Sequence, residues 1–311
     1  MINFRYHVVS LTAVFLALAI GLVMGTAALN NPLSDALKNQ VSSLAKQRQG
    51  DRDRITQLEN QAGKQEQFAQ QAAPIMLANK LAGRQVLVLS MPQTGAAVAG
   101  VVHMLELAGA KVTGQVEIED KFTDPNRKDN LLDVANSTLG ALGTSVTNIP
   151  SNSNGAETSS YLLASVLLTH NPAIPDTAVK TVLTAYKEAN FIVPTGLLVT
   201  PADAVVLVAA QPYTDQDADV RNTAVVTIAE QFSKAGPLVV AAGGAAGSGN
   251  VISAVRGDPA LTKTIATVDN VNTPDGQVAV PLAVAEFLTT TKPGHYGVGG
   301  GASAMLPKQP K

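Results

Sequence analysis

The sequence has 311 residues, a formal net charge of −2 and only 15% charged residues, with no Cys and no Trp. Without a basic excess, nothing recommends a nucleic-acid partner. Without Cys, the chain forms no disulfide, no thiolate metal site and no Cys nucleophile. Its length allows one ordinary hydrophobic core, or two lobes, behind a membrane segment.

The first predicted element is a transmembrane helix at residues 8–29, preceded by a short segment, 1–7. The helix contains no charged residue, and its roughly 22 residues rise about 33 Å, enough to cross a hydrocarbon core of about 30 Å. This length favours an uncleaved anchor over a signal peptide, whose apolar region has roughly 7–15 residues. The closing sequence GTAAL is compatible with cleavage, so that alternative stays open.

Flanking charges predict the orientation of this helix. Arg5 and the N-terminal amine precede it, whereas the first charges behind it are Asp35 and Lys38. Cytoplasmic flanks normally carry the excess of Lys and Arg. We therefore expect a single-pass protein of the inner membrane, with residues 1–7 in the cytoplasm and the bulk of the chain outside it.

Small residues recur every four positions within the predicted span. Ala17, Gly21 and Gly25 therefore share one face of the helix. Such a face lets two helix backbones approach closely, which favours self-association or docking onto another membrane helix. The alternative is that Gly and Ala are simply frequent in membrane helices.

A coiled-coil helix is predicted over residues 32–74. Asn31, Pro32 and Ser34 indicate a fresh helix start, and Pro74 indicates its end. One heptad frame gives a partner interface of Leu37, Val41, Leu44, Arg48, Asp51, Ile55 and Leu58. Because two charges and two glycines weaken this seam, it favours an exchangeable association, such as a homodimer. A Gln-rich stalk that only separates the body from the membrane is the alternative.

Residues 75–290 predict an α/β domain. The segment RQVLVLSMPQTGAAVAGVVHMLELAGAKVTGQVEI indicates a strand, a helix ending near Gly109 and a second strand, which form a right-handed βαβ unit. Two later apolar runs, ADAVVLVAAQP and PLVVAAGG, are typical of strands buried on both faces. We expect a Rossmann-like three-layer sandwich with a mobile loop at 140–158, a turn at 274–276 before the final helix, and a flexible Gly/Pro-rich tail at 291–311.

No pattern predicts a catalytic residue, a metal site or a bound cofactor. The glycines of GGAAGSGN, residues 243–250, have the spacing of a short-chain dehydrogenase loop. They lie late in the chain and no Tyr is followed four residues later by Lys, so a plain connection is the better interpretation. Asp215, Asp217 and Asp219 lack the glycine and the final acid of a calcium loop and are expected to cap a helix.

Histidine adds no motif for a nucleophile or a metal. The four histidines are His7, His103, His170 and His295. Inside a predicted helix, His103 is expected to be a packed or capped residue.

Three stretches are the most distinctive: RYHVVSLTAVFLALAIGLVMG, the Gln-rich helix behind it, and the ending KPGHYGVGGGASAMLP. Together they resemble the actinobacterial MctB/SteB family over essentially the whole chain. The resemblance implies a single-pass membrane protein with an extracytoplasmic α/β domain. It also implies one of two roles. One is copper transport associated with the outer membrane. The other is cell separation, in which the coiled coil, with a SteA-like membrane partner, activates a RipA-like peptidoglycan hydrolase.

The residues favour the second role. Copper(I) requires soft ligands such as Cys and Met, or clustered imidazoles, and the six Met are scattered. Only His103 and Met104 are adjacent, and neighbours on a helix point about 100° apart. We therefore predict a non-enzymatic, membrane-anchored regulator of cell-wall hydrolysis at the septum, with copper transport as the alternative.

Overall fold

A computed structural model provides the structure, in which the chain divides into two units, residues 1–65 and 66–311. It describes residues 4–143, 146, 149–150, 154–168, 174–198, 201–245 and 247–308, with the backbone alone for 28–34. The α-helices are α1 (Phe4–Leu77), α2 (Gly95–Leu107), α3 (Asp120–Thr123), α4 (Lys128–Leu142), α5 (Gly155–Leu167), α6 (Asp176–Glu188), α7 (Ala218–Ala235), α8 (Val251–Gly257) and α9 (Pro274–Thr290). The strands are β1 (Gln85–Ser90), β2 (Lys111–Ile118), β3 (Ile192–Thr195), β4 (Ala204–Ala209), β5 (Leu238–Ala242), β6 (Ile265–Val268) and β7 (His295–Tyr296). Two short 3₁₀ helices are η1 (Pro125–Arg127) and η2 (Leu261–Lys263).

In the first unit the described residues, from Phe4 onward, form one helix. α1 continues through Pro32 and Pro74, so neither the predicted start nor the predicted end of the second helix is a helix boundary. An internal proline costs the helix one backbone hydrogen bond and crowds the carbonyl four residues before it, and α1 accommodates both prolines without ending. Near Pro74 the helix is also held by packing, because Ala73 and Leu77 are fully buried in the second unit.

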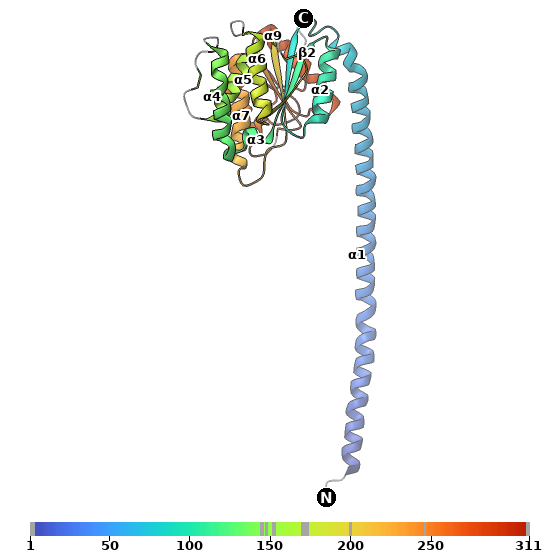
Figure 1. Ribbon diagram of the computed structural model, residues 1–311. Coiled ribbons are helices and arrows are strands. Elements are labelled where there is room, and N and C mark those ends of the chain that lie inside the picture. Colours follow the sequence, from blue (N-terminus) through green and yellow to red (C-terminus); the bar gives the residue numbers. More distant parts are fainter. Residues whose placement is uncertain are drawn as a thin grey trace. The chain divides into compact units, whose positions relative to one another are not determined.

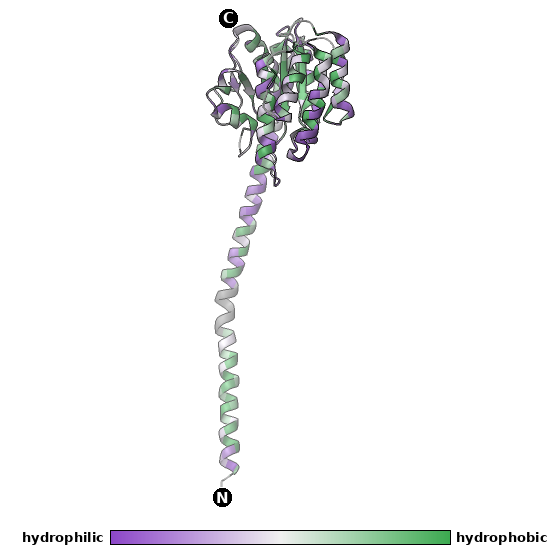
Figure 2. Cartoon of the chain, turned by 60° about the vertical axis from the view of Figure 1, so that its left-hand side comes forward, coloured by the Kyte–Doolittle hydropathy of each residue, from purple (hydrophilic) through white to green (hydrophobic). Residues whose placement is uncertain are grey.

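The N-terminal part of α1 is suited to a membrane. Phe4–Ala27, 24 residues, forms a helix long and apolar enough to cross one, and Figure 2 shows it mostly in the green of hydrophobic residues, beyond a hydrophilic turn at its N-terminal end. None of its most apolar window is buried inside the chain. The predicted span at 8–29 therefore coincides with a helix of sufficient length.

The second unit is an α/β domain built on one sheet. Among the described residues, seven strands pair in the order β3-β2-β1-β4-β5-β6-β7. All neighbouring strands are parallel except β2 and β3, which are antiparallel. The first six strands have the order of the doubly wound Rossmann fold. The predicted α/β class and Rossmann-like topology are confirmed.

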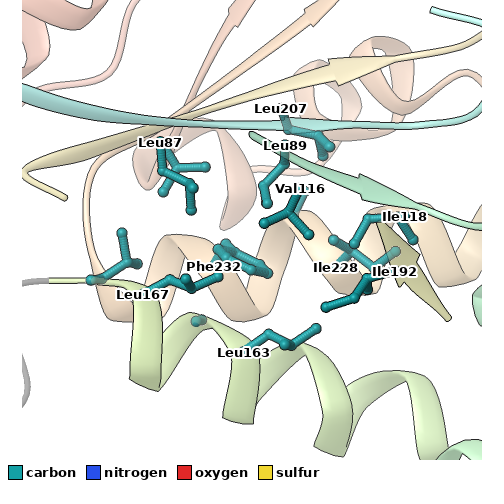
Figure 3. Packing of buried hydrophobic residues seen from close by; sticks show 14 of the residues in the cluster. Leu87, Leu89, Val116, Ile118, Leu163, Leu167, Ile192, Leu207, Ile228 and Phe232 are labelled. Carbon is teal, nitrogen blue, oxygen red and sulfur yellow. The ribbon is translucent and has the colours of Figure 1, made fainter. Parts of the chain in front are cut away.

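Helices cover both faces of the sheet, as the predicted three layers require. In Figure 1, α4 to α7 lie on one side of the sheet and α2 lies on the other. On the first side, Leu87 and Leu207 of the sheet point toward Leu163 of α5 and Phe232 of α7 (Figure 3). The second side packs against α2, α9 and the end of α1. Every side chain of β4 is buried, as expected for a strand covered on both faces.

Several local elements differ from the sequence predictions. Residues 274–276 form the first turn of α9, not a separate turn, because Pro274 lies at the helix start, where its missing N–H has no partner to lose. The expected tail at 291–311 contains β7, which pairs with β6. β3 and β7 have four and two residues, too few to give a periodic pattern. The compact second unit begins at Glu66, ahead of the predicted boundary at 75.

The predicted mobile loop at 140–158 is shorter in the structure. α4 extends to Leu142, and Asn154 caps the start of α5 by accepting hydrogen bonds from the backbone N–H groups of Ala156 and Glu157. Part of the segment between these helices lies outside the described residues, as does His170.

Candidate functional site

The fold has a characteristic place for a ligand. In doubly wound sheets, ligands bind outside the carboxyl ends of the strands, where the strand order reverses. Here that point lies between β1 and β4. The cavity at these strand ends, lined in part by Met91, Gln211 and Tyr213, measures about 20 Å³. That is room for about one water molecule, so side chains of the protein itself fill the usual ligand position.

In a charged cluster beside this position, the positive charge of Arg221 is compensated by acids of the protein itself. Arg221 of α7 forms salt bridges of 2.7 Å with both Asp120 and Asp215. Its guanidinium lies 3.6 Å from the centre of the Tyr213 ring, whose hydroxyl donates to Asp120 at 3.0 Å. Burial is the main cause that raises the pKa of Tyr213. With two carboxylates bound to it, Arg221 has no charge left to attract a phosphate.

In the glycine-rich loop before α8, Asn250 binds the backbone at the start of the helix. The Asn250 side-chain oxygen accepts from the N–H groups of Ile252 and Ser253 at 2.9 and 3.3 Å. Gly249 has a φ of 77°, and a Cβ at this position would collide with Asn222. Asn250 therefore occupies two backbone N–H groups at the start of α8, and the geometry agrees with a plain connection.

The acids of the DQDAD sequence perform separate tasks. Asp215 accepts a hydrogen bond from the backbone N–H of Asp217 at 3.1 Å, besides binding Arg221. Asp217 lies at the N-cap position of α7 but makes no side-chain cap hydrogen bond. Asp219 lies in the first turn of α7, where an acid complements the helix dipole. The prediction that these acids cap the helix holds only in part.

A buried ion pair holds the C-terminal segment against the sheet. Asp269, fully buried after β6, accepts from the backbone N–H groups of Val298 and Gly299 at 2.7 and 3.1 Å. Arg256 of α8 pairs with Asp269 at 2.8 Å and donates to the Tyr296 carbonyl, also at 2.8 Å. These contacts explain why the expected tail is part of the fold.

The described part of the chain contains no group of three or more His, Cys, Asp or Glu that could hold a metal ion. His103 is exposed whereas Met104 is buried, so these neighbours lie in different surroundings. The expectation that His103 is packed or capped is wrong, since it lines an open cleft beside α2. Met1 and His170 lie outside the described residues.

The predicted interface on α1 forms an exposed stripe. Its residues follow one another at alternating spacings of four and three, which places them on one face of the helix. The apolar members are between 52% (Leu44) and 62% (Val41) exposed. Arg48 and Asp51 interrupt them and are exposed too. We call this stripe, from Leu37 to Leu58, the seam.

The small residues of the span leave one helix face open. No atom lies within 4 Å of the position that a Cβ would take at Gly21 or Gly25. Ala17 lies two turns before Gly25 on the same face. Another helix can therefore approach the backbone closely there.

These features define a class of protein: a Rossmann-like α/β domain with a filled ligand crevice, joined to a helix whose N-terminal part has the length of a membrane span. Residues 1–307 match the family described as "Copper transport outer membrane protein, MctB", and the chain belongs to this family. "Copper transporter MctB" of Mycobacterium leprae (strain TN) is 30% identical over 320 residues, which cover 99% of this chain and all of that protein. The proteins of the same name from Mycobacterium tuberculosis (strain ATCC 25618 / H37Rv) and Mycobacterium bovis (strain ATCC BAA-935 / AF2122/97) are 27% identical over 322 residues, with the same coverage. The resemblance to MctB-like proteins is confirmed.

Proposed function

We propose that the chain is a membrane-anchored, non-enzymatic protein of the cell envelope that acts by binding other helices. The observation that carries the proposal is the seam: one continuous helix exposes apolar residues in a heptad pattern between the span and the folded body. Apolar side chains at such positions normally pack against a second helix. At the ligand position usual for this fold, between β1 and β4, the body has room for only about one water molecule.

In this proposal the chain lies in the inner membrane, with residues 1–7 in the cytoplasm and the body outside. It forms a homodimer, packed through the small-residue face of the span and through the seam. Burying a Leu contributes roughly 1.5–3 kcal/mol, so a few seam residues can hold two helices together. Arg48 and Asp51 lower this affinity, which makes the seam available for exchange with another partner.

The names of the relatives favour copper transport as the process in which the chain takes part. Copper would then be the cargo of an assembly that this chain anchors or organises. The distribution of soft ligands is consistent with that role: Met91 and Met104 are buried and Met305 is exposed. The described residues also contain no group of three or more His, Cys, Asp or Glu that could hold a metal ion. The seam is the surface through which the chain would bind the conducting partner.

Cell separation is the second candidate, and the composition of the seam is the observation that favours it. Arg48 and Asp51 interrupt the helix interface and lower its affinity. Polar residues at core positions also select the register and the partner, at the expense of stability. Such a surface suits a switch. In this version the seam pairs with a helical segment of a RipA-like peptidoglycan hydrolase, and a SteA-like membrane protein is the second partner.

One double variant tests the proposal and separates the two processes. Leu44→Asp with Leu58→Asp should abolish self-association of the full chain in detergent, measured by sedimentation, while thermal unfolding of the body stays unchanged. Ser43→Asp with Gln57→Asp is the matched control, because it adds the same charges to the outer face of the same helix. The control should associate like the unmodified chain.

In cells, the two processes predict different phenotypes for the seam variant. Loss of copper tolerance with normal separation would assign the chain to copper transport. Chained cells with unchanged copper tolerance would assign it to cell separation. If the seam variant behaves like its control in both assays, the seam does not carry the function and the proposal is wrong.

A further inference from the structure

The α2 side of the sheet is uncovered at its β2–β3 edge. The helices between β2 and β3, α4 to α6, all supply residues to the core on the opposite side. On the α2 side, a cleft of about 440 Å³ lies between α2 and the antiparallel pair of β2 and β3. This volume is in the range of small-molecule sites, and the cleft is separate from the filled crevice.

Ser90, at the carboxyl end of β1, indicates that the cleft receives a polar ligand. Its side chain is only 7% exposed and lines the cleft. Strand alternation directs it toward α2, because Val86 and Val88 belong to the core on that side. Among the described residues, nothing hydrogen-bonds to its hydroxyl. Buried polar groups are normally paired, so this hydroxyl is available to a bound molecule.

Carboxylates mark both ends of the cleft. Glu117 is in register with Ser90 on the neighbouring parallel strand, close to the start of α2. Glu106 is the last but one residue of α2, and the helix from Gly95 to Glu106 rises about 16 Å. Both acids are exposed to the cleft, and none of its described lining residues is Lys or Arg. A ligand that fits these ends carries positive charge at two separated points.

Between the two carboxylates the walls are mainly apolar. Val98 and Val102, one helical turn apart on α2, line the cleft together with Val193, the cross-strand partner of Glu117. Gln115 and Thr195, the adjacent cross-strand pair, add hydrogen-bonding groups. An apolar middle with an acid at each end is complementary to a methylene chain with an ammonium group at each end.

We propose that this cleft binds a linear polyamine. One terminal ammonium donates to Glu117 and to the Ser90 hydroxyl, and the other donates to Glu106. The methylene groups between them pack against the valines of α2 and β3, and the central ammonium of the polyamine donates to the side-chain oxygens of Gln115 and Thr195. The proposal concerns the body alone and is independent of the function proposed for the seam.

Isothermal titration of the full chain in non-ionic detergent with spermidine tests this site. We expect saturable binding of one spermidine per chain, with ethylamine and ethylenediamine binding at least ~10-fold more weakly because they cannot reach both acids. Glu106→Gln and Glu117→Gln should each weaken spermidine binding by about 10-fold, since each removes one charge-assisted hydrogen bond. Ser90→Ala should weaken it by a smaller factor.

Glu188→Gln is the matched control, because it removes one exposed carboxylate from α6, on the other side of the sheet. Its affinity for spermidine should equal that of the unmodified chain. The proposal is overturned if Glu188→Gln weakens binding as much as the cleft variants do, since binding would then reflect net charge alone. It is equally overturned if spermidine does not bind, or if both cleft variants bind it normally.

Discussion

The two units use the same apolar residue types in opposite ways. Leu44 in the seam is half exposed, whereas Leu207 in the sheet is completely buried. The body brings its apolar residues together from distant parts of one chain and so has a core of its own. The long helix, outside the segment that joins the body, has no second layer to pack against. The stability of the body is therefore internal, and the apolar contacts of the helix depend on another molecule or a membrane.

The largest effect is expected from a truncation within the body. Phe232→Ala removes a fully buried ring from between α7 and the sheet, and should lower the free energy of unfolding by about 3–5 kcal/mol. Leu44→Ala, in the seam, should change it by less than about 0.5 kcal/mol. Chemical denaturation followed by circular dichroism measures both. A similar loss for the two variants would mean that the helix is not independent of the core.

A smaller effect is expected from the charged residues. Like the apolar residues, they are buried in the body at Arg256 and exposed on the helix at Arg48. Arg256→Ala leaves Asp269 buried without its partner and should cost about 3 kcal/mol. This loss is at the low end of the range for buried ion pairs that lose one partner, because the C-terminal segment can open and expose the Asp269 carboxylate to water. Arg48→Ala, at an exposed position, should cost less than about 0.5 kcal/mol.

Limited proteolysis provides a second measurement for the buried pair. Chymotryptic cleavage after Tyr296 should become faster in the Arg256→Ala variant, because Arg256 binds the Tyr296 carbonyl and Asp269 binds the backbone of the residues that follow. In the Arg48→Ala variant, cleavage at this position should be unchanged. Equal protection of the two variants would show that the ion pair does not hold the C-terminal segment.

The smallest expected effect is a pH dependence that originates in the body. His295 is half-buried, with its ring nitrogens 2.9 Å from the Thr267 hydroxyl and 3.3 Å from the Thr262 carbonyl. Burial is the main cause that lowers its pKa below 6.5, and the nearby Arg256 acts in the same direction. The unfolded chain therefore binds this proton more readily than the folded chain does.

The folded chain is therefore stabilised only while His295 is neutral. This stability is fully present above the pKa of His295 in the unfolded chain, and it is lost as the pH falls through the lowered pKa of the folded chain. Melting temperatures measured from neutral pH down to about pH 5 should decline less steeply for His295→Gln than for the unmodified chain. Identical slopes would contradict the assignment to His295.

Local sequence patterns predicted those helices and strands in which all neighbouring residues have the same surroundings, either a membrane or the core. The charge-free run at 8–29 predicted a helix of membrane-spanning length, and the apolar run around β4 predicted a strand buried on both faces. The apolar run PLVVAAGG likewise predicted a strand buried on both faces, and all five residues of β5 are buried. In each case neighbouring residues have one kind of surroundings, so a window of ten to twenty residues contains the information.

The sequence alone therefore determined an apolar helix, a heptad stripe and an α/β domain of parallel strands. Only the tertiary structure decided what closes the ligand crevice and what holds the C-terminal segment. Arg221 pairs with Asp215, six residues away, and with Asp120, which is 101 residues away. Asp269 likewise binds backbone groups 29 and 30 residues further on. These partners meet because parallel strands bring their carboxyl ends to one edge of the sheet, and no pattern confined to a few helical turns contains that geometry.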